Sequence, residues 1–156
     1  MEISIRAAAL DVLHHHASAG FPYEVVGILA GSRHDRSVTL AHPLINERAD
    51  SAATRYVVSG LSLARAEASL EANGLEIVGY YHSHPDHPSQ YSAFDRDHAL
   101  PNMSYMIVSV RNGAIATTQS WRLLEDRSAM DEERVVVLAD SGPDLGPDSG
   151  PDSGPF

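Results

Sequence analysis

The sequence of 156 residues contains no cysteine, and this absence excludes several kinds of site. Without cysteine the chain has no disulfide framework, no cysteine-ligated zinc or iron–sulfur cluster, and no thiol nucleophile. A metal bound by its side chains must therefore use histidine nitrogens and carboxylate oxygens, and nine histidines are available. Lysine is also absent, so that all eleven cationic side chains are arginines.

Long apolar runs are missing as well. No stretch approaches the roughly 18 to 20 apolar residues that a membrane-spanning helix needs. The first residues, Met1-Glu2-Ile3-Ser4, lack the basic segment and apolar run of a secretory signal. The formal net charge of −10 repels the phosphate backbone of nucleic acids. We therefore expect a cytoplasmic protein that binds neither membranes nor nucleic acid, while its oligomeric state stays open.

The residues that are present suit one folded domain with a tail. Hydrophobic residues make up 43% of the chain, close to the roughly 45–50% of ordinary globular domains. From Asp140 onward a Pro-Asp-Ser/Leu-Gly unit recurs every four residues, with aspartates at positions 140, 144, 148 and 152. Such a segment is too rich in proline and glycine to form a core. We predict a domain over residues 1–139 and a disordered acidic tail over residues 140–156.

Local patterns within residues 1–139 alternate between helical and extended periods. Helices are predicted at residues 3–17, at residues 61–72 before Gly74, and at residues 92–100 before Pro101. Strands are predicted at residues 25–30, 37–40, 55–58, 75–82, 105–110, 114–121 and 134–138, with Asn112-Gly113 as a hairpin turn. These patterns predict an α/β fold with a mixed β-sheet flanked by helices.

Most histidines stand in places that do not favour metal binding. His14, His15 and His16 are consecutive on a predicted helix, so they point in different directions, and we expect them to be exposed. His34 and His42 stand alone. His82 and His84 differ, because residues i and i+2 at the end of a strand lie on one face and bring two imidazoles together. Two neutral nitrogens at one point suit zinc.

The residues after this pair supply a carboxylate. Ser92 follows His84 after seven residues, and Asp95 stands three further on, so both project to one side of the first turn of a helix. This pair is typical of a capping box, and Asp95 can also return as the third ligand; both interpretations can hold together. Asp86 and Asp97 are competing carboxylates. Asp86 falls in the loop, and Asp97 would face roughly 200° away from Asp95.

The complete pattern resembles the metal motif of the JAMM (MPN+) zinc metallopeptidases. It consists of His82-Ser83-His84, seven residues, Ser92, two residues and Asp95, and the family's upstream glutamate has a candidate in Glu24, within residues 22–31. The resemblance implies the JAMM/MPN (cytidine-deaminase-like) fold and one zinc ion per chain, held by His82, His84 and Asp95. It also implies that Glu24 is the general base and that Ser92 stabilises the oxyanion.

The resemblance extends to the substrate class. The chain lacks the long insertions and the cysteine-containing second metal site of the eukaryotic ubiquitin-cleaving members, so it looks like a minimal prokaryotic member. This implies a deubiquitinase-like isopeptidase that hydrolyses an amide bond at the C-terminal Gly-Gly end of a ubiquitin-like, sulfur-carrier protein. The alternative is a catalytically silent scaffold or binding module of the same fold.

A second motif overlaps the first. The run from His82 to His87 also fits the His-x-His-x-Asp-His signature of metallo-β-lactamase folds. That fold needs two further histidines far downstream, whereas the last histidine here is His98. The sequence therefore favours the JAMM interpretation.

Overall fold

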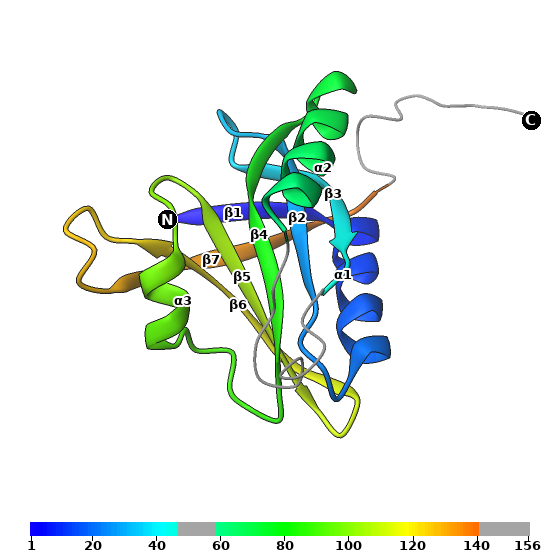
Figure 1. Ribbon diagram of the computed structural model, residues 1–156, viewed down its shortest axis with the longest axis vertical. Coiled ribbons are helices and arrows are strands. Elements are labelled where there is room, and N and C mark those ends of the chain that lie inside the picture. The colour runs from blue at the N-terminus through cyan, green and yellow to red at the C-terminus, as the bar shows by residue number, and fades with distance from the viewer. Residues whose placement is uncertain (47–58, 141–156) are drawn as a thin grey trace, which may run out of the picture.

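The computed structural model describes residues 1–46 and 59–140. Seven strands and three helices are found within these ranges (Figure 1). In chain order they are β1 (Glu2–Arg6), α1 (Ala7–Gly20), β2 (Val26–Ser32), β3 (Ser37–Leu44), α2 (Gly60–Ala72), β4 (Glu76–Pro85), α3 (Ala93–His98), β5 (Ser104–Arg111), β6 (Ala114–Leu123) and β7 (Met130–Leu138). The strand predicted at residues 55–58 and the tail after Asp140 lie outside the described residues.

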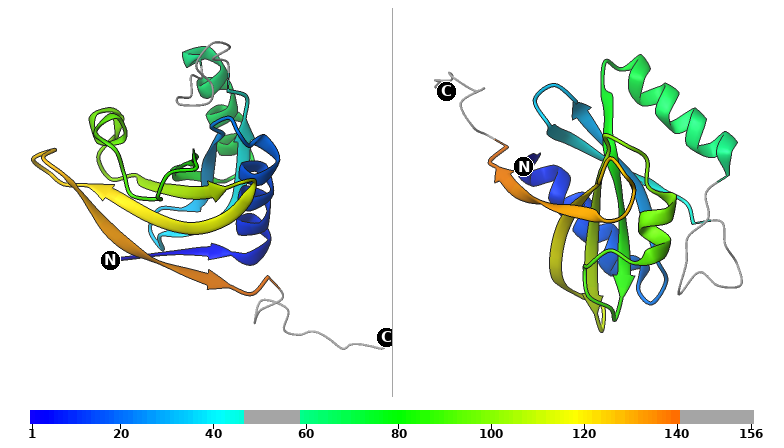
Figure 2. Two further views of the ribbon diagram at one scale, coloured as in Figure 1. Left: turned by 90° about the horizontal axis from the view of Figure 1, so that it is seen from below. Right: turned by 90° about the vertical axis from the view of Figure 1, so that its left-hand side faces the viewer.

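The strands form one mixed sheet that closes on itself in the order β1-β3-β2-β4-β5-β6-β7. Strand β1 closes the barrel because it pairs in parallel with both β3 and β7. The views of Figure 2 show how strongly the sheet curves to bring the first and last strands side by side. The predicted mixed sheet with flanking helices is confirmed; its closure, in which each of the seven described strands has two neighbours, was not predicted.

The first element corrects the predicted helix over residues 3–17. Residues 2–6 form a strand, and the helix begins only at Ala7 and runs to Gly20. Ile3 and Ile5 alternate with polar neighbours, which is a strand period, and both are fully buried. Their pairing partners come from β3 and from the far end of the chain. Local spacing alone could not show those partners.

Helix α1 covers one face of the sheet. Its inward residues Ala9, Leu13 and Ala17 follow helical spacing and pack into the main core. The sheet contributes Tyr81 and Met106 to the same core, and both are fully buried. Full burial of a side chain such as Leu13 contributes about 1.5–3 kcal/mol, so this face is a major source of stability.

The N-terminus of α1 is capped from the other end of the described chain. The Asp140 carboxylate accepts a hydrogen bond from the Ala8 N–H at 2.9 Å. The Arg6 guanidinium donates to the Ala139 carbonyl at 3.1 Å. Arg6 itself occupies the N-cap position and its side chain makes no capping bond. Asp140 therefore does for α1 what a serine or aspartate at the N-cap usually does.

Helices α2 and α3 lie toward the opposite face. Leu70 of α2 packs on Ile28 and Ile77 of the sheet, and Gly74 ends this segment with a φ of +80°. Strand β4 is buried on both faces: Tyr81 and Ser83 point toward the core under α1, and the residues that alternate with them point the other way. His82 and His84 therefore lie on the face that carries α2 and α3. None of the helices in the two described ranges has the length and apolar character to cross a membrane.

Candidate metal and catalytic centre

Strand β4 presents His82 and His84 as a pair on one face, as the sequence pattern predicted. Their ring centroids are 5.1 Å apart, and both residues lie within the last four positions of the strand. The exposed fraction is 2% for the His82 side chain and 11% for the His84 side chain. Both imidazoles are therefore shielded from bulk water and lie close to each other.

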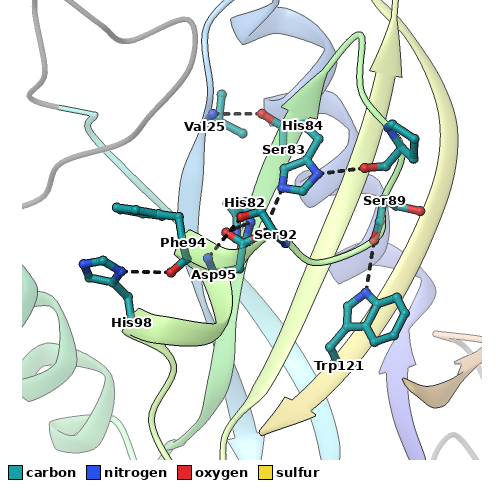
Figure 3. A network of polar contacts seen from close by, with 11 residues as sticks. Val25, His82, Ser83, His84, Ser89, Ser92, Phe94, Asp95, His98 and Trp121 are labelled. Carbon is teal, nitrogen blue, oxygen red and sulfur yellow. Dashed lines mark hydrogen bonds and ion pairs between the residues drawn. The ribbon is translucent and has the colours of Figure 1, made fainter. Parts of the chain in front are cut away.

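Asp95 meets the two histidines from α3. Its Oδ1 lies 3.0 Å from His82 Nε2 and its Oδ2 lies 3.1 Å from His84 Nε2. Figure 3 shows how the three side chains come together. One ligand atom from each residue can be chosen so that all three lie within 4.8 Å of one another. No other such group of three or more occurs in the described parts of the chain. The structure thus brings together the three residues for which the sequence predicted a shared metal.

Ser92 and Asp95 form the predicted capping box. The Ser92 Oγ accepts from the Asp95 N–H at 3.1 Å, and the Ser92 N–H donates to Asp95 Oδ2 at 2.8 Å. This reciprocal pair begins α3 and orients the carboxylate toward the histidines. Because the Ser92 oxygen accepts in this pair, its hydroxyl proton can be donated to a group in the cavity that Ser92 lines.

The charges at this centre favour an ionised Asp95. Burial alone would raise the pKa of Asp95, but hydrogen bonds from His82 and His84 outweigh it and hold that pKa far below the usual range. Burial lowers the pKa of His84, and this effect is exceeded by the hydrogen bonds to Asp95 and to the Pro88 carbonyl, so the net shift is upward. A positive charge is therefore stabilised where the three side chains meet.

His84 has a second contact that fixes its tautomer. Its Nδ1 lies 2.7 Å from the Pro88 carbonyl oxygen, which can only accept, so Nδ1 carries a proton. In the neutral ring Nε2 then has a lone pair that faces the ionised Asp95 oxygen. Two lone pairs repel at this distance unless a proton or a cation lies between them. The donor set of two Nε2 atoms and a carboxylate, with one ring held by a carbonyl, fits zinc.

Glu24 reaches the same centre from a distant part of the chain. It stands two residues before β2 and directly before the strand predicted at residues 25–30. The β2–β4 register pairs Val26 with His82, and its continuation places Glu24 beside His84 on the same face. The negative charge of Glu24 contributes to the raised pKa of His84, and both residues line one cavity.

That cavity has a volume of about 320 Å³. Its lining residues are Glu24, His84, His87, Pro88, Gln90, Tyr91 and Ser92. A second, more apolar cavity of about 190 Å³ lies beside the same strands, with Val26, Tyr80, Leu100 and Tyr105 among its lining residues. Two recesses therefore lie near the centre, and the one that Glu24 lines has more polar side chains in its wall.

The competing carboxylates lie elsewhere. The Asp86 carboxylate accepts from the Asn112 N–H at 3.2 Å, and the Asp97 carboxylate pairs with Arg96 at 3.1 Å. The expectation for the first histidine cluster was wrong in part. His14 and His16 are half-buried and contact the Thr118 hydroxyl and the Tyr81 hydroxyl, so tertiary packing occupies them.

Sequence reasoning missed the residues that hold the loop between His84 and Ser92. The Ser89 hydroxyl donates to Gln119 at 2.7 Å, and the indole N–H of Trp121 donates to the Ser89 carbonyl at 3.0 Å (Figure 3). Both bonds tie the loop to β6. A serine in a proline-containing loop gives no local signal of this role, since its partners lie about thirty positions away.

A family model described as prokaryotic homologues of the JAB domain matches residues 6–124. A desampylase of Haloferax volcanii is 38% identical over 112 residues, which span 69% of this chain and 80% of that protein. A probable TtuB-protein conjugate cleaving protease of Thermus thermophilus is 35% identical over 98 residues, 63% of this chain and 64% of that protein.

Solved structures of similar shape cover most of the chain. A protein from Desulfitobacterium hafniense has a TM-score of 0.76 and 25% identity, over 90% of this chain and 94% of that one. A JAB1/MPN domain protein from Archaeoglobus fulgidus has a TM-score of 0.57 and 16% identity, over 88% of this chain and 98% of that one. The second likeness shows the fold alone.

Proposed function

Because this chain belongs to the family of prokaryotic homologues of the JAB domain, we propose that it is a zinc-dependent isopeptidase that acts on the C-terminal end of a ubiquitin-like protein. The proposal is supported by the names of its relatives, a desampylase and a probable TtuB-protein conjugate cleaving protease. The single observation that carries the chemistry is the convergence of His82, His84 and Asp95 beside a cavity that Glu24 and Ser92 also line.

His82, His84 and Asp95 would hold the zinc ion, one per chain. When bound, zinc supplies a Lewis acid and lowers the pKa of a coordinated water to about 7. Three protein ligands leave a position open for water, which is typical of catalytic rather than structural sites. The Pro88 carbonyl keeps the proton of His84 on Nδ1, so that the lone pair of Nε2 would be available to bind the metal.

Glu24 and Ser92 would carry the remaining steps. The Glu24 carboxylate accepts a proton from the attacking water and returns it to the leaving amine. The Ser92 hydroxyl donates to the oxygen of the amide carbonyl as negative charge develops there. Because Glu24 must approach the leaving nitrogen, the polar cavity shared by Glu24, His87 and Gln90 would hold the leaving group. The acyl side would then extend toward the apolar cavity beside Tyr80 and Leu100.

The decisive experiment compares two substrates with and without a chelator. The first is a prokaryotic ubiquitin-like protein with a C-terminal peptide extension, and the second is the same protein joined to a lysine side chain by an isopeptide bond. Zinc-loaded protein should release the free Gly-Gly end, and the chelator should stop the reaction. Glu24→Gln is the matched variant: it should bind zinc normally and lose about 10²- to 10⁴-fold in kcat. Zinc-loaded protein that cleaves neither substrate would favour the catalytically silent scaffold instead.

A further inference from the structure

The peptide unit that joins Glu24 to Val25 is held by side chains on both of its sides. Its carbonyl, from Glu24, accepts a hydrogen bond from the side-chain amide of Asn46 at 2.9 Å. Its N–H, from Val25, donates to the Ser83 Oγ at 2.9 Å (Figure 3). The first bond comes from the segment after β3 and the second comes from β4. Side chains from both sides of the β2 segment therefore hold the same peptide unit.

The sheet register explains why these two residues stand there. Val26 pairs with Leu44 on β3 and with His82 on β4. Continuing each antiparallel register by two residues places Glu24 level with Asn46 on one side. Continuing by one places Val25 level with Ser83 on the other, and the Ser83 N–H donates to the Val25 carbonyl at 3.1 Å. The side chains of Asn46 and Ser83 therefore continue the hydrogen bonding of the sheet to the residues just before β2.

A fixed peptide plane restricts the direction in which the Glu24 side chain leaves the backbone. Glu24 belongs to neither a helix nor a strand, and the turn before it is tied by the Tyr23 N–H to the Gly20 carbonyl at 2.9 Å. A general base must reach its proton within hydrogen-bond distance, and a misplacement of about 1 Å can reduce the rate about 10²-fold. The two side-chain bonds supply the constraint that a strand ladder would otherwise give.

We propose that Asn46, together with Ser83, is a positioning residue that orients Glu24 for proton transfer. This inference rests on the proposed function, because it takes Glu24 as the base. Neither residue needs to touch the substrate or the metal. Ser83 points to the face of β4 opposite to His82 and His84. Its Oγ contacts the Val25 N–H, next to Glu24.

The test is a set of kinetic measurements on the full chain with zinc at saturation. Asn46→Ala should lower kcat by about 10- to 10²-fold, leave KM within about twofold, and retain one zinc per chain by elemental analysis. Asn46→Asp keeps the size and removes the N–H donor, so it should show the same loss. The matched control is Asn73→Ala, because Asn73 also donates from its amide to a backbone carbonyl, that of Ser69 at 2.8 Å, at the far end of α2.

A double-mutant cycle separates positioning from general damage. In a Glu24→Gln background, single-turnover rates should not fall further on adding Asn46→Ala, because the base on which Asn46 acts is already absent. Ser83→Thr should retain the rate and Ser83→Ala should reduce it, which keeps the inference testable if an Asn46 variant does not fold.

The outcomes distinguish this inference from the proposed function. Wild-type protein that is inactive with zinc refutes the isopeptidase itself. Active wild-type protein with Asn46→Ala equal to Asn73→Ala overturns the positioning role. An Asn46→Ala loss that is as large in the Glu24→Gln background as in the wild-type background would overturn it too, as would zinc loss in Asn46→Ala.

Discussion

Replacement of Ser92 by alanine separates stability from catalysis. The lost Ser92 Oγ accepts from the Asp95 N–H at 3.1 Å and caps α3. Removing a serine N-cap costs about 1 kcal/mol, which lowers the melting temperature of a domain of this size by about 2–4 °C. Removing one donor to a developing oxyanion lowers kcat by about 10²- to 10³-fold. The rate loss should therefore far exceed what the small change in stability can explain.

Ser59 provides the matched control for this variant. It caps α2 by accepting from the Ser62 N–H at 3.0 Å, and it does not line the cavity of Glu24. Ser59→Ala should show a similar fall in melting temperature and keep its kcat. Thermal melts measure stability, elemental analysis measures zinc content, and kcat is measured at saturating zinc. A Ser92→Ala protein as active as Ser59→Ala refutes the oxyanion role, and one that cannot be saturated with zinc shows that Ser92 acts through Asp95.

Three further outcomes follow from the same contacts. His84→Ala should lose zinc by elemental analysis, and full retention would place the metal elsewhere. Deleting residues 141–156 should leave the melting temperature unchanged. Asp140→Ala should lower stability by about 0.5–1 kcal/mol, because the Ala8 N–H loses its hydrogen-bond acceptor. Equal melting temperatures for the two variants would contradict the capping role of Asp140. Burial lowers the pKa of His14 and of His16, so both bind protons more weakly folded than unfolded, and stability should fall as pH drops below about 6.5. A His14→Gln, His16→Gln protein should show a weaker dependence in thermal melts between about pH 5.5 and 7.5, and an unchanged dependence would rule these two residues out.

The sequence predicted best what depends on neighbouring positions. His82 and His84 share a face because strand side chains alternate, and Ser92 and Asp95 meet because a first helical turn brings them together. The turn at Asn112-Gly113 was also predicted correctly, and both residues have positive φ, 50° and 83°. Each of these patterns carries its physical cause within a few residues.

What sequence reasoning missed depends on partners far along the chain. Residues 2–6 form a strand because β3 and β7 flank them, whereas in the sequence alone Ile5 also continues the helical spacing of Ala8 and Val12. Asp140 was predicted to belong to the tail, but its carboxylate accepts a hydrogen bond from the Ala8 N–H of α1. His16 was expected to be exposed, but its Nδ1 lies 2.7 Å from the hydroxyl of Tyr81, a residue of the core. Closure of the sheet produces the first two contacts, and packing of α1 on the sheet produces the third.

Glu24 shows most clearly how a local pattern and long-range pairing combine. Its side chain faces the histidines only if β2 and β4 keep the register that pairs Val26 with His82, since a slip of one residue would turn Glu24 toward the face of α1. Gly27 fits this register because it lies opposite Tyr81, and a Cβ at Gly27 would overlap the Tyr81 ring. The same ring is buried against α1 and holds His16. The packing of the core under α1 therefore favours the register that brings Glu24 to His84 on the other face.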